Sequence, residues 1–220
     1  QNVKKSYLMK DWPVCSISNA IDINKWKPID KNSSRKTLKL PGDLSLILFG
    51  STSGTKDYHK GFDLLEKSLQ KLQSINKKIG LVIFGEDEPF IKPNFKFPIF
   101  YLGFLQNSKS LIAAYSAADM VLIPSRVESF GQVASEANAC SCPVVAFNTS
   151  GLRTTVRHKV SGYLARAFDT DDFLKGVLWV LNNYNPELKS NCRKHVIDNF
   201  AASKIALKHI ELYENIIKKL

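Results

Sequence analysis

Short runs of apolar residues recur along most of the chain, separated by segments in which apolar residues return every three or four positions. From residue 44 onward, uninterrupted or nearly uninterrupted apolar runs occupy residues 44–49, 81–84, 99–102, 121–123 and 144–147. Such runs are typical of strands that are buried on both faces, whereas the wider spacing is typical of amphipathic helices. The pattern therefore predicts strands that alternate with helices.

Helical spacing is clearest in three places between and after these runs. Leu64, Leu65, Leu69 and Leu72 share one face of a helix, and Leu111, Ile112 and Tyr115 share a face of another that Ser108 could cap. Asp169 or Thr170 could cap a third helix with its apolar positions at 174, 177, 178 and 181. Two more helices follow, of which the last covers about residues 203–220.

The first forty residues differ from the rest and form a lead-in. Residues 10–19 contain a short apolar strand, and residues 24–39 are polar and include Pro28. We expect this segment to be a linker that packs onto the domain.

Alternating strands and helices indicate an α/β domain with a doubly wound, Rossmann-like parallel sheet and helices on both faces. Such sheets bind ligands beyond the carboxyl ends of their strands. The loops expected to carry function are therefore residues 50–61, 85–90, 103–108, 124–131 and 148–153.

Composition narrows the class of protein. The chain has 220 residues, of which 44% are apolar, so a sizeable core is expected. The apolar stretches are far shorter than a bilayer span, and residues 1–10 lack the pattern of a signal segment. The four cysteines form neither a metal-ligand pattern nor a disulfide framework, which favours small buried residues in a reducing compartment.

The charge balance bears on partners. The formal net charge is +11 and the pI is about 9.5, which suits nucleic acid, an anionic membrane surface or an ordinary solvated surface. The lysines are spread along the whole chain, without a basic block interleaved with aromatic residues. We therefore expect no nucleic-acid partner and favour a phosphate-bearing ligand or a membrane surface.

One candidate phosphate contact follows the first strand. Gly50 and Gly54 enclose a hydroxyl-rich loop, and Lys60 with Gly61 opens the next helix. Neither a Walker loop nor a Gly-x-Gly-x-x-Gly turn is present, which argues against a P-loop ATPase or an NAD site. A lysine at a helix N-terminus can hold a diphosphate, although a solvated surface lysine has the same sequence pattern.

A second candidate is the pair Glu128 and Glu136, which flank a predicted turn and helix start. Eight helical steps span about 12 Å at 1.5 Å per residue, a distance comparable to that between the ribose and the sugar of a nucleotide diphosphate-sugar. The amides near Phe130 and Gly131 would face the diphosphate at the positive end of the helix. The competing interpretation is one capping glutamate and one solvated glutamate.

Residues 124–146 resemble the E-x7-E signature of retaining GT-B glycosyltransferases (glycosyl transferases group 1). Other matching segments are residues 47–51 and 59–65, the strand at 115–124, Leu102 to Phe104, the late turn from Ser161 to Leu164, and the linker at 12–28. The resemblance implies the C-terminal, donor-binding half of a GT-B fold. It divides the chain into a linker (1–40), a nucleotide-sugar-binding domain (41–200) and a C-terminal crossover helix (201–220).

The resemblance also implies residue roles. Glu128 would be catalytic, contacting the donor sugar at the reacting carbon. Glu136 would bind ribose hydroxyls, Lys60 would neutralise the diphosphate, and Gly103 and Phe104 would face the nucleobase. The remaining donor contacts would come from Ser51, Ser129, Phe130 and Gly131. No metal or other cofactor is implied.

Two departures from the family pattern affect this assignment. Ser51 stands where many members have an arginine, so Lys56 or Arg126 are alternative cations for the leaving group. Residues 156–159 read Val-Arg-His-Lys where an acidic Val-Glu-His-Gly pattern is common, so substrate preference is not carried over there.

The resemblance implies a hexosyltransferase acting in polysaccharide biosynthesis, with a UDP-, GDP- or ADP-sugar as donor and a glycan or lipid-linked acceptor. It places the protein in the cytoplasm, with the cytoplasmic face of the membrane as a further partner. An N-terminal acceptor domain is expected to be missing, so the chain alone should bind donor and transfer little sugar. Two alternatives stay open: a sugar-nucleotide epimerase of GT-B architecture, and a nucleotide-sugar-binding module without chemistry.

Overall fold

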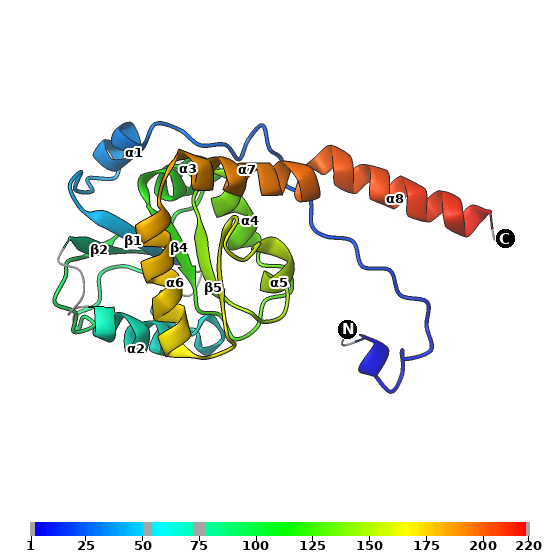
Figure 1. The fold of residues 1–220 in the computed structure, drawn as a ribbon, viewed down its shortest axis with the longest axis horizontal. Coiled ribbons are helices and arrows are strands. Elements are labelled where there is room, and N and C mark those ends of the chain that lie inside the picture. Colours follow the sequence, from blue (N-terminus) through cyan, green and yellow to red (C-terminus); the bar gives the residue numbers. More distant parts are fainter. Residues whose placement is uncertain (1–2, 51–53, 73–77, 219–220) are drawn as a thin grey trace.

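The computed structural model describes residues 3–50, 54–72 and 78–218, and within them it contains a parallel sheet of six strands (Figure 1). The strand order is β3-β2-β1-β4-β5-β6. The strands are β1 (Ser45–Gly50), β2 (Ile79–Phe84), β3 (Ile99–Tyr101), β4 (Met120–Ile123), β5 (Val144–Phe147) and β6 (Gly162–Ala165). The predicted α/β fold with a doubly wound parallel sheet is confirmed.

Helices cover both faces of the sheet (Figure 1). Helices α2 (Phe62–Leu72) and α6 (Thr170–Asn183) pack on the face to which Ile47 and Phe49 of β1 point. Helices α3 (Ser108–Ala117) and α4 (Gln132–Ala139) pack on the face to which Leu46 and Leu48 point, and α7 (Pro186–Phe200) contacts α4. Two apolar clusters therefore lie on opposite sides of strands that are apolar at nearly every position.

The shorter elements complete the domain. Helix α1 (Lys31–Thr37) precedes the sheet, α5 (Leu152–Thr155) follows β5, and α8 (Ala202–Ile217) ends the described chain. Three 3-10 turns are present among the described residues: η1 (Val3–Lys5), η2 (Gly54–Lys56) and η3 (Tyr58–Lys60).

The observed N-cap residues can be compared with the predicted helix starts. Asp169 caps α6, because its carboxylate accepts from the backbone N–H groups of Asp171 and Asp172. The prediction for α3 was wrong by one residue. The side chain of Asn107 accepts from the backbone N–H of Ser110 at 2.9 Å, and Ser108 is already the first helical residue.

Three further predictions need correction. Residues 10–19 form no strand, and the polar stretch after Pro28 contains α1, which Asp30 caps at Ser33. The segment from Ser161 to Leu164 is not only a turn, because it supplies most of the edge strand β6, which pairs with β5. This strand was missed because it begins at a glycine and its central residues, Tyr163 and Leu164, are only half-buried.

The lead-in packs onto the domain from Ile21 onward. The Ile21 N–H donates to the carbonyl of Phe200 at 2.7 Å, and the Arg193 guanidinium donates to the carbonyls of Ile23 and Trp26. Before Ile21 the chain extends away from the body, as α8 does at the other end (Figure 1). Helix α8 exposes apolar side chains, as expected: Leu207, Ile210, Tyr213, Ile216 and Ile217.

The sheet order positions the site. Strands β1 and β4 are neighbours, and the chain adds strands outward from β1 in one direction and then from β4 in the other. At such a switch point the loops after the two central strands separate and leave a crevice for a ligand. The loops in question lead from β1 to α2 and from β4 to α4.

Candidate functional site

A lysine and a glutamate from these two loops meet at the switch point. Lys60 ends η3 just before α2, Glu128 follows β4, and the Lys60 Nζ lies 2.7 Å from Glu128 Oε1. The Ser125 hydroxyl donates to the same Oε1 at 2.9 Å. The two side chains are 26% and 17% exposed, so the pair is partly shielded but can be reached by a ligand.

Gly61 allows this approach. Its φ is 69°, and a Cβ at this position would lie 2.1 Å from the carbonyl oxygen of Pro124. Any other residue would push the loop that carries Lys60 away from the loop that carries Glu128. The glycine after Lys60 is therefore part of the site's geometry.

The amides at the start of α4 form the second component of the site. Among the described residues, no acceptor is present for the backbone N–H groups of residues 129–133, and the N-cap Gly131 offers no side chain. Unpaired N–H groups at a helix N-terminus bind anions, and the helix dipole adds to the attraction. This run is suited to a phosphate group.

Residues after β5 shape that run. Gly151 donates its N–H to the carbonyl of Glu128 at 2.9 Å, and a Cβ on Gly151 would lie 2.5 Å from the Cα of Phe130. The Ser150 hydroxyl accepts from the Glu128 N–H at 2.9 Å. Gly131 itself has a φ of 90°, and a Cβ there would lie 2.9 Å from Thr155 Oγ1.

The side chains of Ser129 and Phe130, which precede Gly131, lie in different surroundings. Ser129 is exposed, whereas the half-buried Phe130 ring packs edge-on against Phe200 at 5.4 Å between centroids. Phe130 therefore offers its backbone to a ligand while its ring anchors the loop to α7.

Glu136 lies in the first turns of α4, half-buried beside α3. The Tyr115 hydroxyl donates to its Oε2 and the Gln132 amide to its Oε1, both at 3.2 Å. Burial raises the pKa of this carboxyl, and the two hydrogen bonds oppose that rise. The expected spacing of eight helical steps is wrong, because α4 begins at Gln132 and Glu128 lies before the helix.

The loop after β3 is also at this edge of the sheet. Gly103 has a φ of 62° and its carbonyl accepts from the Gly85 N–H at 2.8 Å. The backbone N–H and carbonyl of Phe104 have no partner among the described residues, and the Phe104 ring is 57% exposed. Phe104 can therefore offer both a stacking face and backbone hydrogen bonds.

The alternative cations lie differently from Lys60. Arg126 makes two hydrogen bonds to Asp63, at 2.8 and 2.7 Å, and stacks on the Tyr58 ring at 3.9 Å. It is thus committed to the protein, whereas Lys56 is exposed. Ser51, a predicted donor contact, lies outside the described residues.

Metal and thiol chemistry add little to the site. The described residues hold no group of three or more His, Cys, Asp and Glu that could bind a metal ion. Cys140, Cys142 and Cys192 are buried, as expected, but Cys15 is exposed. No helix within the described ranges has the length and apolar character to cross a membrane.

Sequence reasoning missed four residues that hold the predicted ones in place: Ser125, Ser150, Gly151 and Tyr115. Ser150 and Gly151 fall in a loop expected at this edge of the sheet, residues 148–153, so its position was available as a signal. The hydrogen bond from Tyr115 to Glu136 joins α3 to α4, and no local sequence pattern predicts it.

Comparison of the sequence with known proteins identifies glycosyltransferases. A family model described as Glycosyl transferases group 1 matches residues 30–198. An uncharacterized glycosyltransferase of Methanocaldococcus jannaschii, MJ1607, is 29% identical over 225 residues, covering 91% of this chain and 56% of the relative.

Solved structures show the same fold. A sucrose-phosphate synthase from Thermosynechococcus elongatus superposes with a TM-score of 0.80 at 24% identity, over 100% of this chain and 56% of that one. Anabaena Alr3699/HepE, solved in complex with UDP and glucose, superposes with a TM-score of 0.71 at 21% identity, over 90% of this chain and 56% of that one. The chain spans about half the length of the curated relatives it matches.

Proposed function

Because the chain belongs to group 1 of the glycosyl transferases and has the fold of a GT-B C-terminal domain, we propose that it binds a nucleotide diphosphate-sugar. In a protein that also carries an acceptor domain, it transfers the sugar to a glycan or lipid-linked acceptor with retention of configuration. No metal takes part in this proposal.

The observation that carries the proposal is the run of unpaired amides at residues 129–133 beside Lys60 and Glu128. A diphosphate at the start of α4 satisfies those amides, and its negative charge is balanced by Lys60. The crystal complex of Alr3699/HepE with UDP and glucose supports UDP as the first nucleotide to test.

In the transfer step, the bond between the sugar C1 and the diphosphate oxygen breaks, and the electron pair leaves with the diphosphate. The acceptor oxygen forms the new bond to C1, and its proton moves to the departing diphosphate. Lys60 and the amides of residues 129–133 stabilise the charge that develops on the leaving group. In this proposal Glu128, held by Lys60 and Ser125, stabilises the positive charge that develops at C1.

The ends of the donor have separate partners in this proposal. Glu136, when ionised, accepts hydrogen bonds from ribose hydroxyls while Tyr115 and Gln132 hold its side chain. The base lies against Phe104, whose backbone N–H and carbonyl supply hydrogen bonds. Backbone recognition leaves no signature in side chains, so the base must be determined by experiment.

Isothermal titration of the 220-residue chain with UDP, UDP-glucose, GDP-glucose and ADP-glucose tests the binding. We expect saturable binding of one nucleotide series, and the Lys60→Ala variant should lose roughly tenfold or more in affinity, because it removes a charged phosphate contact. Lys67→Ala, which removes an exposed lysine from the same region, is the matched control and should bind as the wild type does. Failure of all four ligands to bind would contradict the proposal.

The Glu128→Ala variant, made in a protein that joins this chain to an acceptor domain, distinguishes a transferase from a binding module without chemistry. A transferase loses turnover, whereas a module changes only in its affinity for the nucleotide.

A further inference from the structure

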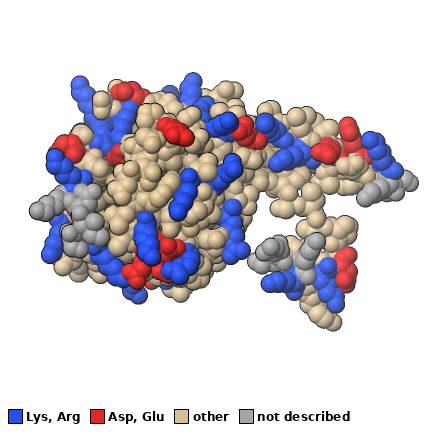
Figure 2. Space-filling model, in the orientation of Figure 1, with Lys and Arg blue, Asp and Glu red and all other residues tan. Residues whose placement is uncertain are grey.

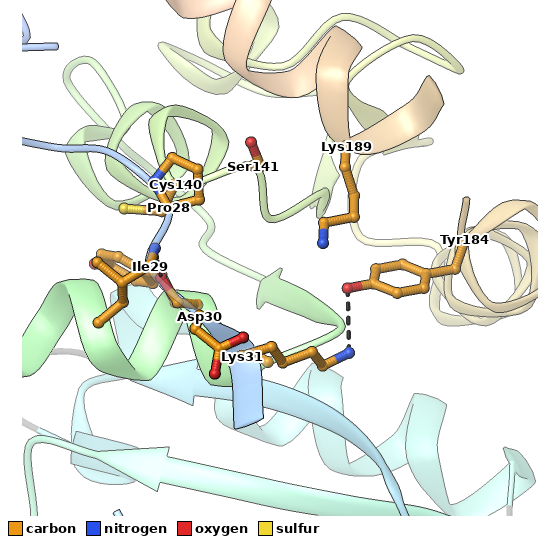
Figure 3. A pocket seen from close by; sticks show the side chains of 11 residues that line it. Pro28, Ile29, Asp30, Lys31, Cys140, Ser141, Tyr184 and Lys189 are labelled. Carbon is orange, nitrogen blue, oxygen red and sulfur yellow. Dashed lines mark hydrogen bonds between the residues drawn. The ribbon is translucent and has the colours of Figure 1, made fainter. Parts of the chain in front are cut away.

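A cavity lies away from the candidate site, and Figure 3 shows the side chains that line it. Its volume is about 220 Å³, whereas a single water molecule needs only roughly 10–15 Å³ of such space. The walls come from the segment before α1, the ends of α3 and α4, and the junction of α6 and α7. Because helices α3 and α4 lead into β4 and β5 there, the cavity lies at the amino ends of the strands.

The polar wall of the cavity carries excess positive charge. The Lys31 ammonium pairs with Asp119 and donates to the Tyr184 hydroxyl at 3.2 Å. The other Asp119 oxygen is already occupied, since it accepts from Arg35 at 2.8 Å and from the Leu46 N–H at 2.7 Å. Two cations thus share the single buried carboxylate of Asp119.

Lys189 adds a third cation from the first turns of α7 (Figure 3). It has no carboxylate within ion-pair distance among the described residues, although its ammonium lies 6.0 Å from the Tyr184 ring centroid. Asp30 is the acidic residue among those that line the cavity, and its carboxylate caps α1, where it accepts from the Ser33 N–H at 2.8 Å.

Two hydroxyl groups complete the polar wall. Burial raises the pKa of the Tyr184 hydroxyl well above its ordinary range, so the group stays protonated at neutral pH. It accepts from Lys31 and its own proton is free to donate within the described structure. The Ser141 hydroxyl likewise has no partner among the described residues and lines the cavity.

We propose that this cavity binds a phosphate monoester, with the phosphate between Lys189, Lys31 and the hydroxyls of Tyr184 and Ser141. The less polar part of the wall, to which Pro28, Ile29 and Tyr115 contribute, accepts the small organic part of the ester. A phosphate suits this site because its several acceptor oxygens can meet Lys189 and the two hydroxyls, which lack an acceptor in the described chain, and can add to the single carboxylate that Lys31 shares with Arg35.

Nuclear magnetic resonance of the 220-residue chain tests the site without any nucleotide. Inorganic phosphate and glycerol 3-phosphate are titrated at constant ionic strength, with chloride as the reference anion. We expect saturable shifts at the amides of Ser141, Tyr184 and Lys189, with tighter binding of glycerol 3-phosphate. No saturable shift at these amides, or tighter binding of inorganic phosphate, would overturn the proposal.

Variants separate this cavity from the donor site. Lys189→Ala should weaken phosphate binding at the cavity amides by roughly tenfold or more, because a charge-assisted contact is lost. Lys194→Ala, an exposed lysine on the same helix, is the matched control and should leave the titration unchanged. Lys60→Ala should also leave it unchanged while altering the response at residues 129–133, so the two proposals fail independently.

Tyr184→Phe keeps the aromatic ring and removes one donor, so it should weaken binding with little change in folding. An unchanged affinity in both Lys189→Ala and Tyr184→Phe would assign the phosphate to some other surface and contradict the inference.

Discussion

Two contacts between a lysine and a carboxylate lie at opposite edges of one sheet. At the carboxyl edge, Lys60 pairs with Glu128, and at the amino edge, Lys31 and Arg35 pair with Asp119. The carboxylates are similarly shielded, at 17% and 11% exposure. Distance and burial alone do not tell them apart.

The surroundings of the two carboxylates differ. Asp119 receives two cations and the Leu46 N–H, and so ties the lead-in to β1 and β4. Glu128 lies beside a run of amides, residues 129–133, that have no acceptor in the described chain. Asp119 is a structural contact because both of its oxygens are already paired, whereas the unpaired amides beside Glu128 indicate a place for a ligand.

The largest expected effect comes from breaking the saturated pair. Asp119→Ala leaves Arg35 buried without its carboxylate, so the free energy of unfolding should fall by about 3–5 kcal/mol. Urea unfolding followed by circular dichroism measures this, with Asp43→Ala at an exposed aspartate as the control. UDP affinity of the folded variant should stay within about twofold, since Asp119 is at the far edge of the sheet. A loss below about 1 kcal/mol would assign Asp119 no structural role.

The matching change at the carboxyl edge should affect chemistry instead of folding. In a protein that joins this chain to an acceptor domain, as proposed, Glu128→Gln should lower kcat by roughly 10²–10³-fold, the range for removing one group that stabilises transition-state charge. The free energy of unfolding of the 220-residue chain should change by less than about 1 kcal/mol, because the pair is partly solvated. Steady-state kinetics measures the change in kcat, and urea unfolding measures the change in the free energy of unfolding. Unchanged turnover with a large loss of stability would place Glu128 in the same class as Asp119.

The pair of Arg126 and Asp63 extends the comparison, and breaking it should have a smaller effect on stability. Arg126 lowers the pKa of Asp63 and is hydrogen-bonded to it through both guanidinium nitrogens. Arg126→Ala should cost about 0.2–1 kcal/mol of stability, as exposed pairs do. Titration calorimetry should show UDP affinity within about twofold of the wild type, because the guanidinium is committed to Asp63. A large loss of affinity would instead make Arg126 the missing cation for the diphosphate.

The smallest expected effect is a pH dependence at Glu136. Burial raises the pKa of this carboxyl above its unfolded value of about 4.5, so the folded state binds the proton more tightly than the unfolded state. The stability of the wild type relative to Glu136→Gln should therefore be greatest below that pH and fall as pH rises through the folded pKa. Urea unfolding at pH 4, 5, 6 and 7 measures this trend, and a rise with pH would contradict the burial effect.

Much of the fold could be predicted because its strands are apolar at nearly every position. Strand β6 could not, since it lies at the edge, begins at Gly162 and leaves Tyr163 and Leu164 half-buried. Helix α1 was hidden in a polar stretch because its contact with the body is made by the buried Arg35, not by an apolar stripe.

The candidate site could be predicted in its members but not in its pairing. Lys60 and Glu128 are 68 residues apart, and only the adjacency of β1 and β4 brings them together. Asp119 escaped notice for the same reason, since its partners are 84 and 88 residues away. Long-range charge contacts depend on strand order, which the local apolar pattern does not encode.

Tyr115 connects the cavity to the candidate site. It is among the residues that line the cavity, and its hydroxyl donates to Glu136 on α4. Thermodynamic linkage then requires reciprocity: any factor by which a phosphate ester in the cavity changes UDP affinity must equal the factor by which UDP changes affinity for the ester. Tyr115→Phe cuts the shared hydrogen bond and should bring that factor toward one.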